Sequence, residues 1–240
     1  MCAAVSATAL RIASVLPDLL GTYGDGGNVR VLERRVAWRG HPVEVVTVLV
    51  GQAVPAEVDL YVLGGGEDEA QVTALAALRA SPLVRAVDSG AHVFGVCAGL
   101  QLLGEWFQGT DDVVHEGLGI IDAVTERLPE RVVGEVVATF DPALGLPALT
   151  GFANHGGGTI LGPRAAALAT TVQGGGNDGR VGGAEGAMQG RAVASYLHGP
   201  VLARNPALAD WLLARVLGVA LDPLPDGPPE RLHRALTQGW

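Results

Sequence analysis

Short apolar runs alternate with longer segments of helical periodicity along the first hundred residues, and this alternation limits the possible folds more than any other feature. The apolar runs occupy residues 9–16, 43–48, 58–63 and 92–96. Helices are predicted between them, at about residues 29–39, 67–79 and 82–90. Buried strands that alternate with helices form a parallel sheet with crossover connections. The sequence therefore predicts an α/β protein with an open, mostly parallel sheet and helices on both faces.

The second half of the chain has a different pattern, with many glycines between its apolar runs. Strands are predicted at residues 118–125 and 132–140, on either side of a charged turn, and at residues 184–188 and 192–197. A glycine-dense loop is predicted at residues 174–183 and a helix at residues 206–217. A proline-rich segment then leads to a short C-terminal helix. We therefore predict a main domain over residues 1–221, with added antiparallel strands, and an appendage over residues 222–240.

All sixteen basic residues are arginines, so the chain lacks the lysine that several cofactor and nucleotide sites require. Schiff bases, pyridoxal phosphate and the phosphate-binding P-loop all depend on a lysine. We therefore predict no cofactor in this chain, and we expect any ATP and Mg²⁺ to bind to a partner subunit. The formal net charge of −9 argues against a surface for nucleic acid or anionic membrane.

Cysteine content and hydropathy restrict the cellular setting. The two cysteines, Cys2 and Cys97, are too few for a disulfide framework or a cysteine metal cluster. The sequence has no uninterrupted apolar stretch of membrane-spanning length. These features predict a cytoplasmic protein.

The most informative segment is residues 95–99 (GVCAG), which follows an apolar strand and precedes a helix predicted to extend to Phe107. A nucleophile on such a sharp turn projects from the sheet at a helix N-terminus, where backbone amides favour the reactive thiolate. The pattern therefore indicates that Cys97 is a nucleophile. The alternative is that Cys97 is a small buried side chain at a strand end.

A thiol nucleophile needs a base, and six histidines are candidates. His198 follows the predicted strand at residues 192–197, so it should lie at the carboxyl edge of the sheet, where open α/β folds bind ligands. Cys97 and His198 are therefore predicted to meet there, unless His198 only closes its strand. His41, His92 and His233 are interpreted as structural or solvated, and His155 as part of a loop that lines the pocket or contacts a partner.

Cys97, Gln101 and the ending at residues 196–200 together resemble class I glutamine amidotransferases. The chain is most similar to the cobyric-acid-synthase-like branch of that family and, within it, to the glutaminase subunits (GatD) of lipid II isoglutaminyl synthases. The resemblance covers about residues 10–221 and implies a flavodoxin-like core. It is carried by residues 22–28 (TYGDGGN), 63–66 (LGGG), 97–101 (CAGLQ), 116–119 (EGLG), 151–157 (GFANHGG) and 196–200 (YLHGP).

The resemblance implies a mechanism and a substrate site. In this mechanism Cys97 attacks the side-chain amide of glutamine, ammonia leaves, and water hydrolyses the glutamyl thioester, with His198 as base and acid. The backbone N–H groups of Gly65 and Ala98 are expected to form the oxyanion hole. Arg131 and Gln101 are expected to bind the substrate. The alternative for Arg131 is a solvated side chain in a charged turn.

The resemblance also implies a partner. Family members of this kind form a heterodimer with an ATP-dependent, Mur-ligase-like subunit (MurT), which amidates the D-glutamate α-carboxyl of lipid II to D-isoglutamine in peptidoglycan synthesis. The usual family triad has a glutamate two residues after the histidine, whereas this chain has Pro200 there. A carboxylate that orients His198 is therefore expected from elsewhere in the chain or, as our preferred hypothesis, from the partner.

Other interpretations stay open at this level. The chain could be the glutaminase unit of another ATP-dependent amidation, such as one of cobyrinic-acid type, a non-catalytic module with the same fold, or a cysteine peptidase. The retained Cys97 and His198 argue against a non-catalytic module, and the ending at residues 198–200 argues against a peptidase. The glycine-rich loop at residues 24–28 is interpreted as a tight loop at the edge of the active site or at the partner interface.

Overall fold

The computed structural model describes residues 9–110 and 112–238. Its central sheet has six strands in the order β11-β12-β4-β3-β1-β2, and neighbouring strands are parallel except for the pair β11 and β12. This arrangement confirms the predicted α/β fold with a mostly parallel sheet. The strands are β1 (Leu10–Val15), β2 (Val43–Val48), β3 (Leu60–Leu63), β4 (His92–Val96), β11 (Ala187–Gln189) and β12 (Ala192–Ser195).

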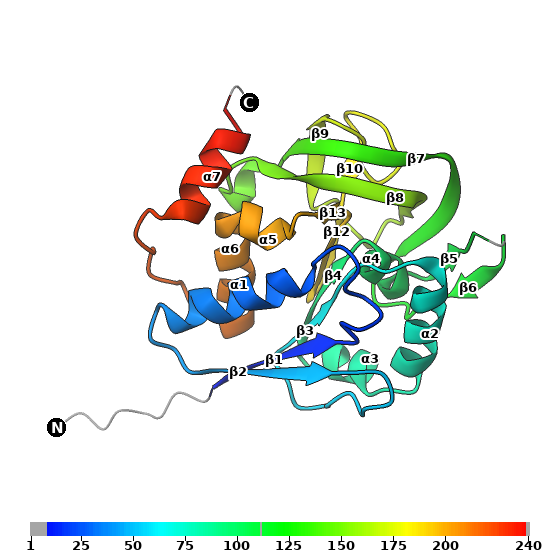
Figure 1. Ribbon diagram of the computed structural model, residues 1–240, viewed down its shortest axis with the longest axis horizontal. Coiled ribbons are helices and arrows are strands. Elements are labelled where there is room, and N and C mark those ends of the chain that lie inside the picture. The colour runs from blue at the N-terminus through cyan, green and yellow to red at the C-terminus, as the bar shows by residue number, and fades with distance from the viewer. Residues whose placement is uncertain (1–8, 111, 239–240) are drawn as a thin grey trace.

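Helices cover both faces of this sheet because the crossovers run in opposite directions (Figure 1). α1 (Gly26–Ala37) joins β1 to β2, whereas α2 (Asp68–Arg79) and α3 (Leu83–Asp88) join β3 to β4 on the other side of β1. Right-handed crossovers in opposite directions place their helices on opposite faces. α4 (Ala98–Leu103) follows β4, and α6 (Pro206–Leu217) packs beside α1.

The direction of the crossovers reverses between the neighbouring strands β1 and β3. The loops that follow these two strands therefore diverge and leave a crevice at the carboxyl edge of the sheet. Open α/β sheets bind their ligands in such a crevice. The fold thus predicts a ligand site bordered by the loops after β1, β3 and β4.

A second, mostly antiparallel sheet lies beside the first and has the order β10-β9-β7-β5-β6, with β8 paired to β7 and β13 paired to β8. β12 ends at Ser195 in the central sheet, and β13 begins two residues later in the second sheet, so the chain passes between the sheets just before His198. Its strands are β5 (Trp106–Gln108), β6 (Val114–Glu116), β7 (Ala123–Thr139), β8 (Leu149–Leu161), β9 (Ala169–Gln173), β10 (Ala184–Glu185) and β13 (Leu197–His198).

Three sequence predictions for this region are wrong. The strands predicted at residues 118–125 and 132–140 form one strand, β7, because a register shift against β8 between Arg127 and Val132 accommodates the charged segment. The helix predicted to reach Phe107 ends at Leu103, since the Glu105 N–H donates to the Ala123 carbonyl (2.8 Å) and the chain then enters β5. Residues 154–157, predicted as a turn, lie inside β8.

The sequence analysis did not predict β8 as one strand, because the segment contains several glycines and glycine has a low strand propensity. Here their small size is needed for packing. A Cβ at Gly157 would lie 2.5 Å from Gln101 Nε2, and one at Gly158 would lie 2.6 Å from Leu128 Cδ2. The strand therefore tolerates glycine because side chains from elsewhere fill the space.

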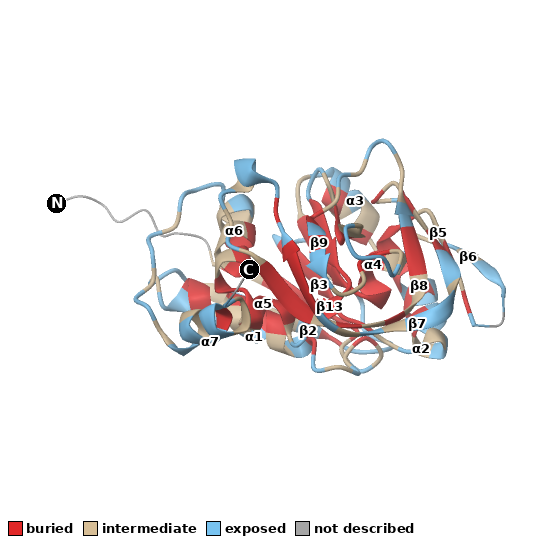
Figure 2. Cartoon of the chain, turned by 90° about the horizontal axis from the view of Figure 1, so that it is seen from above, coloured by how far each residue is buried: buried red, intermediate tan, exposed pale blue. Residues whose placement is uncertain are grey.

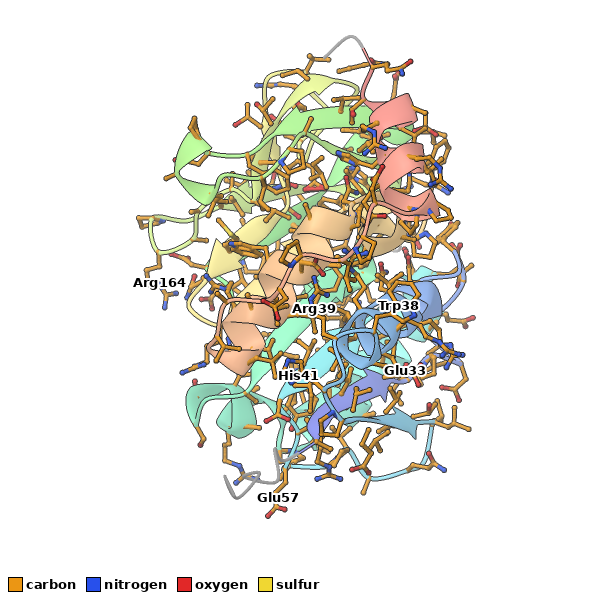
Figure 3. The ribbon with its side chains drawn as sticks, turned by 90° about the vertical axis from the view of Figure 1, so that its left-hand side faces the viewer. Glu33, Trp38, Arg39, His41, Glu57 and Arg164 are labelled. Atoms are coloured by element: carbon orange, nitrogen blue, oxygen red, sulfur yellow. The ribbon has the colours of Figure 1, made fainter. Side chains whose placement is uncertain are left out.

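Two arginines, Arg35 in α1 and Arg39 just after that helix, hold the C-terminal helices against α1 (Arg39 is labelled in Figure 3). Arg35 donates to both carboxylate oxygens of Asp210 in α6 (2.6 and 2.7 Å) and to Glu230 (3.1 Å) in α7 (Pro228–Leu236). Arg39 also donates to Asp210 (2.7 Å). Of the two interpretations given for His233, structural or solvated, the structure confirms the structural one: His233 lies on α7 and is buried, with its Nδ1 2.9 Å from a carbonyl of α5 (Val201–Arg204). The predicted boundary at residue 221 stays a prediction.

The core is centred on the parallel sheet (Figure 2). Every residue of β3, β4 and β12 is buried, which explains their nearly continuous apolar sequence. Within residues 9–110 and 112–238, no helix combines the length and the apolar character that crossing a bilayer would require. Cys2 and the final residue of the predicted C-terminal helix, Trp240, lie outside the described residues.

Candidate active site

Four segments that are distant in sequence meet at the carboxyl edge of the central sheet. A Cβ added at Gly65 would lie 2.7 Å from His198 Cε1, 3.1 Å from Asp25 Oδ2 and 3.2 Å from Cys97 Cβ. Asp25, Cys97 and His198 are only 1%, 6% and 3% exposed. The structure thus brings together Cys97 and His198 as predicted from their strand ends, and it adds Asp25. Their catalytic roles remain predictions.

Cys97 occupies the sharp turn that its sequence context predicts. Its φ of 51° and ψ of −105° lie outside the ordinary regions for a residue with a side chain, and α4 begins at the next residue. Glycine is required on both sides of Cys97 because other backbone segments lie too near for a side chain. A Cβ at Gly95 would lie 2.9 Å from the Gly99 carbonyl carbon, and one at Gly99 would lie 2.8 Å from the Leu63 oxygen. Strained turns of this kind are typical of nucleophiles presented at the edge of a sheet.

Asp25 and His198 form a buried pair. His198 Nδ1 lies 3.2 Å from each carboxylate oxygen of Asp25. If Nδ1 carries the proton and donates it to Asp25, the lone pair of the imidazole is on Nε2. Nε2 is buried and has no hydrogen-bond partner among the described residues. The pair therefore leaves one basic nitrogen available for a proton near Cys97.

Burial opposes ionisation of the Cys97 thiol in this structure. It raises the pKa to about 12, and the negative charge of Asp25 acts in the same direction, while the Ala98 N–H and Arg131 oppose them. The favourable influence of the helix N-terminus on the thiolate stays a prediction, and α4, only six residues long, acts here against desolvation. Formation of a thiolate consequently depends on a nearby base.

The two predicted oxyanion-hole donors have different surroundings. The backbone N–H of Ala98 is hydrogen-bonded to the Cys97 sulfur, so it points toward the position of the reacting atom. The N–H of Gly65 donates instead to Asp25 Oδ2 at 2.8 Å. Gly65 can serve as a donor only after this bond is released, and the prediction for both residues stays untested.

A cavity of about 190 Å³ opens next to Cys97, and Gln101 and Arg131 are among the residues that line it. Arg131 lies on β7, where its Nε donates to Asn154 Oδ1 (2.6 Å) and its Nη2 lies 3.4 Å from the Tyr23 hydroxyl. These contacts point the guanidinium at the cavity. The alternative in which Arg131 only contacts solvent is therefore not what the structure shows.

Gln101 belongs to the wall of the cavity through a buried polar network. Its Oε1 accepts from Gln71 (2.8 Å), and its Nε2 donates to the Tyr196 hydroxyl (3.2 Å), which also hydrogen-bonds Thr159 (2.6 Å). One N–H of the amide is left for a ligand. Substrate binding by Gln101 stays a prediction, and the structure adds a wall-forming role.

His155 also lines the cavity and is kept neutral. Its ring stacks on Tyr196, with the centroids 3.9 Å apart, and its Nδ1 lies 2.7 Å from the Gly157 oxygen. Burial lowers its pKa to about 4, and the charges of His198 and Arg131 act in the same direction. The interpretation of His155 as a residue that lines the pocket is therefore confirmed, although it lies in a strand.

The lowered pKa of His155 predicts acid destabilisation. The unfolded chain binds a proton at this side chain below pH 6.5, whereas the folded chain does so only near pH 4, so stability is lost as the pH falls between these values. At about pH 5 the loss from this residue is on the order of 2 kcal/mol. Urea unfolding at about pH 5 and pH 7 should show a smaller difference for His155→Phe, which keeps the aromatic ring, than for the wild type. An equal difference in both proteins would contradict this assignment.

Asp25 is the candidate site residue that the sequence analysis did not assign. Of the two sources expected for an orienting carboxylate, the structure offers one within the chain, because Asp25 contacts His198. The preference for a carboxylate from the partner stays a prediction. Asp25 is the N-cap of α1, so only the first part of the segment predicted as a loop at residues 24–28 is a loop, and the helix begins at Gly26. The segment lies at the active-site edge as interpreted. A sequence feature that could have identified Asp25 is its place in the segment directly after β1. The direction of the crossovers reverses between β1 and β3, and residues after these two strands border the ligand crevice.

Comparisons with known proteins agree with this geometry. Residues 11–206 match the family model of the CobB/CobQ-like glutamine amidotransferase domain. The chain is 31% identical to the GatD subunit of lipid II isoglutaminyl synthase from Staphylococcus aureus, over 89% of this chain and 88% of that protein. It is also 31% identical to the GatD subunit from Streptococcus pneumoniae, over 87% and 80% of the two chains.

More distant relatives and solved structures give the same picture. A cobyric acid synthase from Sphingopyxis alaskensis is 35% identical over 74% of this chain, which spans 36% of that protein. A crystal structure of a glutamine amidotransferase superposes with a TM-score of 0.59 at 22% identity, covering 86% of this chain and 99% of the other. One from Thermotoga maritima superposes with a TM-score of 0.56 at 18% identity, over 96% and 91%.

These matches confirm the fold and both resemblances noted in the sequence, to the GatD subunits and to the cobyric-acid-synthase-like branch. The family match covers most of the chain, including the residues that surround Gly65. The chain belongs to the CobB/CobQ-like glutamine amidotransferase family.

Proposed function

We propose that this chain is the glutamine-hydrolysing subunit of a lipid II isoglutaminyl synthase. The observation that carries the proposal is the buried arrangement of Cys97, His198 and Asp25 around Gly65, because it supplies a thiol, a base and an orienting carboxylate in one place. The similarity to two GatD subunits over most of both chains supports the assignment of the subunit.

The first half of the reaction forms a thioester. The side-chain amide of glutamine enters the cavity beside Cys97, and His198 Nε2 takes the proton from the thiol as the sulfur attacks the amide carbon. Asp25 accepts the hydrogen bond from Nδ1–H, stays ionised and stabilises the imidazolium that forms. The Ala98 N–H stabilises the negative oxygen, and the imidazolium then protonates the leaving nitrogen, so the C–N bond breaks and ammonia departs.

The second half regenerates the thiol. His198 removes a proton from water, the water oxygen attacks the thioester carbon, and the C–S bond breaks to give glutamate. Cys97 recovers its proton from the imidazolium. Release of the Gly65 N–H from Asp25 would supply a second donor to the oxyanion in both halves.

The ammonia is used by a partner subunit. Because the chain has no lysine for a phosphate-binding loop, the ATP-dependent activation of the acceptor is assigned to a Mur-ligase-like subunit of the MurT type, which also binds Mg²⁺. In the proposed heterodimer this partner amidates the D-glutamate α-carboxyl of lipid II to D-isoglutamine. The setting of this reaction is the cytoplasm.

Transfer of the amide nitrogen tests the proposal. The chain is combined with the Mur-ligase-like protein of its organism, ATP, lipid II and L-glutamine labelled with ¹⁵N in the side-chain amide. We expect the label in the lipid II amide. With Cys97→Ala in the complex, glutamine should no longer support amidation, whereas added ammonium chloride should still do so, because only the ammonia source is lost.

Two results would contradict the proposal. Amidation supported by glutamine in the Cys97→Ala complex would exclude the thiol mechanism. Ammonia release from glutamine with no transfer to lipid II, under conditions in which ammonium chloride supports the reaction, would point to another acceptor, such as one of cobyrinic-acid type.

A further inference from the structure

The cavity beside Cys97 has a buried reactive end and a charged mouth. Cys97 lines its buried end, and the buried Asp25 and His198 meet Cys97 around Gly65. Glu67 and Arg131 also line the cavity, and both side chains are exposed to solvent. A ligand whose amide reaches Cys97 therefore places its other end between a carboxylate and a guanidinium.

Tyr23 fixes the spacing of these two charges. Its hydroxyl donates to Glu67 Oε1 at 2.9 Å and lies 3.4 Å from Arg131 Nη2. The Tyr23 ring also covers His198, with the ring centroids 4.6 Å apart. Glu67 and Arg131 thus flank one hydroxyl group, so that a carboxylate and a guanidinium both lie beside it, as the ammonium and carboxylate groups of an α-amino acid would require.

We propose that Glu67 binds the α-ammonium group of the glutamine substrate, so that Glu67 and Arg131 together recognise its zwitterionic end and Tyr23 positions both. This inference rests on the proposed glutaminase function and assigns a specificity-determining residue within that site. The contact with Glu67 would make the site bind free glutamine more tightly than compounds that carry a carboxamide but no α-amino group.

The contact with Tyr23 distinguishes Glu67 from the other carboxylates near the cavity. Asp25 is engaged by His198 and Gly65. Asp68 also lines the cavity, but it accepts the Thr110 N–H at 2.8 Å and makes no hydrogen bond to Tyr23 or Arg131 among the described residues. The second carboxylate oxygen of Glu67 has no hydrogen-bond partner among the described residues. An ammonium group can therefore bind there without displacing an existing contact.

The charges of Glu67 and Arg131 both reach the reactive end of the site. Arg131 lowers and Glu67 raises the pKa of the Cys97 thiol. A bound α-carboxylate would offset the first charge and a bound α-ammonium group the second, so the zwitterion meets an opposite charge at each end.

Glu67→Gln separates this role from a general effect on the site. The amide keeps the size of the side chain and loses its charge, and a hydrogen bond to a charged group contributes enough that we expect KM for L-glutamine to rise about 10- to 100-fold. We expect kcat to change less than about threefold, because the buried catalytic residues are untouched. Ammonia release is measured with the complete complex.

The control ligand is 4-carbamoylbutanoate, which is glutamine without its α-amino group. Its inhibition constant against L-glutamine should be the same in Glu67→Gln as in the wild type, or lower, because it has no ammonium group to lose. The matched control variant is Glu69→Gln, an equal loss of charge two residues along the chain that lies outside this cavity; it should leave both constants unchanged. Tyr23→Phe should also raise KM for L-glutamine, but by a smaller factor than Glu67→Gln.

Three outcomes overturn the inference. They are an unchanged KM in Glu67→Gln, an equal weakening of L-glutamine and 4-carbamoylbutanoate, and an equal effect of Glu69→Gln. Each of them leaves the proposed function intact as long as the wild type releases ammonia from L-glutamine. A wild-type complex that neither hydrolyses nor binds L-glutamine overturns the proposed function, and this inference with it.

Discussion

Replacement of Cys97 by alanine is expected to abolish ammonia release from L-glutamine, to below about one part in 10⁴ of the wild-type rate. The reason is that no other thiol lies among the residues that the structure describes around the cavity, and covalent catalysis fails when its nucleophile is removed. The measurement is ammonia and glutamate formation by the purified complex, with both products quantified.

The Cys97→Ala protein should fold normally. Alanine is smaller than cysteine and leaves the backbone contact between the Cys97 N–H and the Ser195 carbonyl (2.8 Å) in place. An unchanged far-ultraviolet circular dichroism spectrum and unchanged association with the partner would show this. Appreciable glutamine hydrolysis by a folded Cys97→Ala protein would contradict the nucleophile assignment.

Asp25→Asn is expected to lower kcat for glutamine hydrolysis by about 10²- to 10⁴-fold with little change in KM. Asparagine can still accept the Gly65 N–H, but it then presents an amide N–H₂ to His198 Nδ1. This arrangement favours the tautomer that carries its proton on Nε2, so the imidazole can no longer act as the base. Steady-state kinetics of ammonia release measure the effect.

Asp18→Asn is a matched control for the charge change, since Asp18 lies in the same connection after β1 and accepts the Val50 N–H (3.0 Å) away from the cavity. Its kinetics should equal those of the wild type. The same assay also tests our earlier preference for a partner carboxylate: if the partner supplies one, Asp25→Asn should be nearly as active as the wild type in the complex. Activity within about threefold of the wild type would exclude Asp25 as the orienting residue.

The part of the site that lies on predictable elements was accessible from the sequence. Cys97 and His198 each follow a buried apolar strand, and parallel strands bring their carboxyl ends to one edge. Asp25 was not accessible in this way, because its contact with His198 joins residues that are 173 positions apart through a loop whose path no local pattern specifies. The role of Glu67 could not be predicted from sequence for the same reason, because its hydrogen-bond partner Tyr23 lies on a different loop.

The second sheet shows where local propensity fails. β7 contains a charged, exposed segment that is typical of a turn, yet pairing with β8 keeps it extended across a register shift. β8 contains glycines that a strand normally avoids, yet Gln101 and Leu128 fill the space beside them. In both strands, contacts between residues distant in sequence override the preferences of the residues themselves.

The extent of desolvation at Cys97 is visible only in the folded chain. The sequence shows that a helix follows this residue, but not that the thiol is buried and its pKa raised. For the proposed mechanism this means that His198, oriented by Asp25, supplies the base that forms the thiolate.

The most direct test of a thiol-dependent glutaminase is the mass of the chain trapped during turnover. The complex is mixed with L-glutamine, quenched in acid within the steady state and digested, and the peptide that contains Cys97 is examined by mass spectrometry. We expect a glutamyl adduct on Cys97 in the wild type and none in Cys97→Ala. Steady ammonia release with no adduct on Cys97, or an adduct on another residue, would contradict the account.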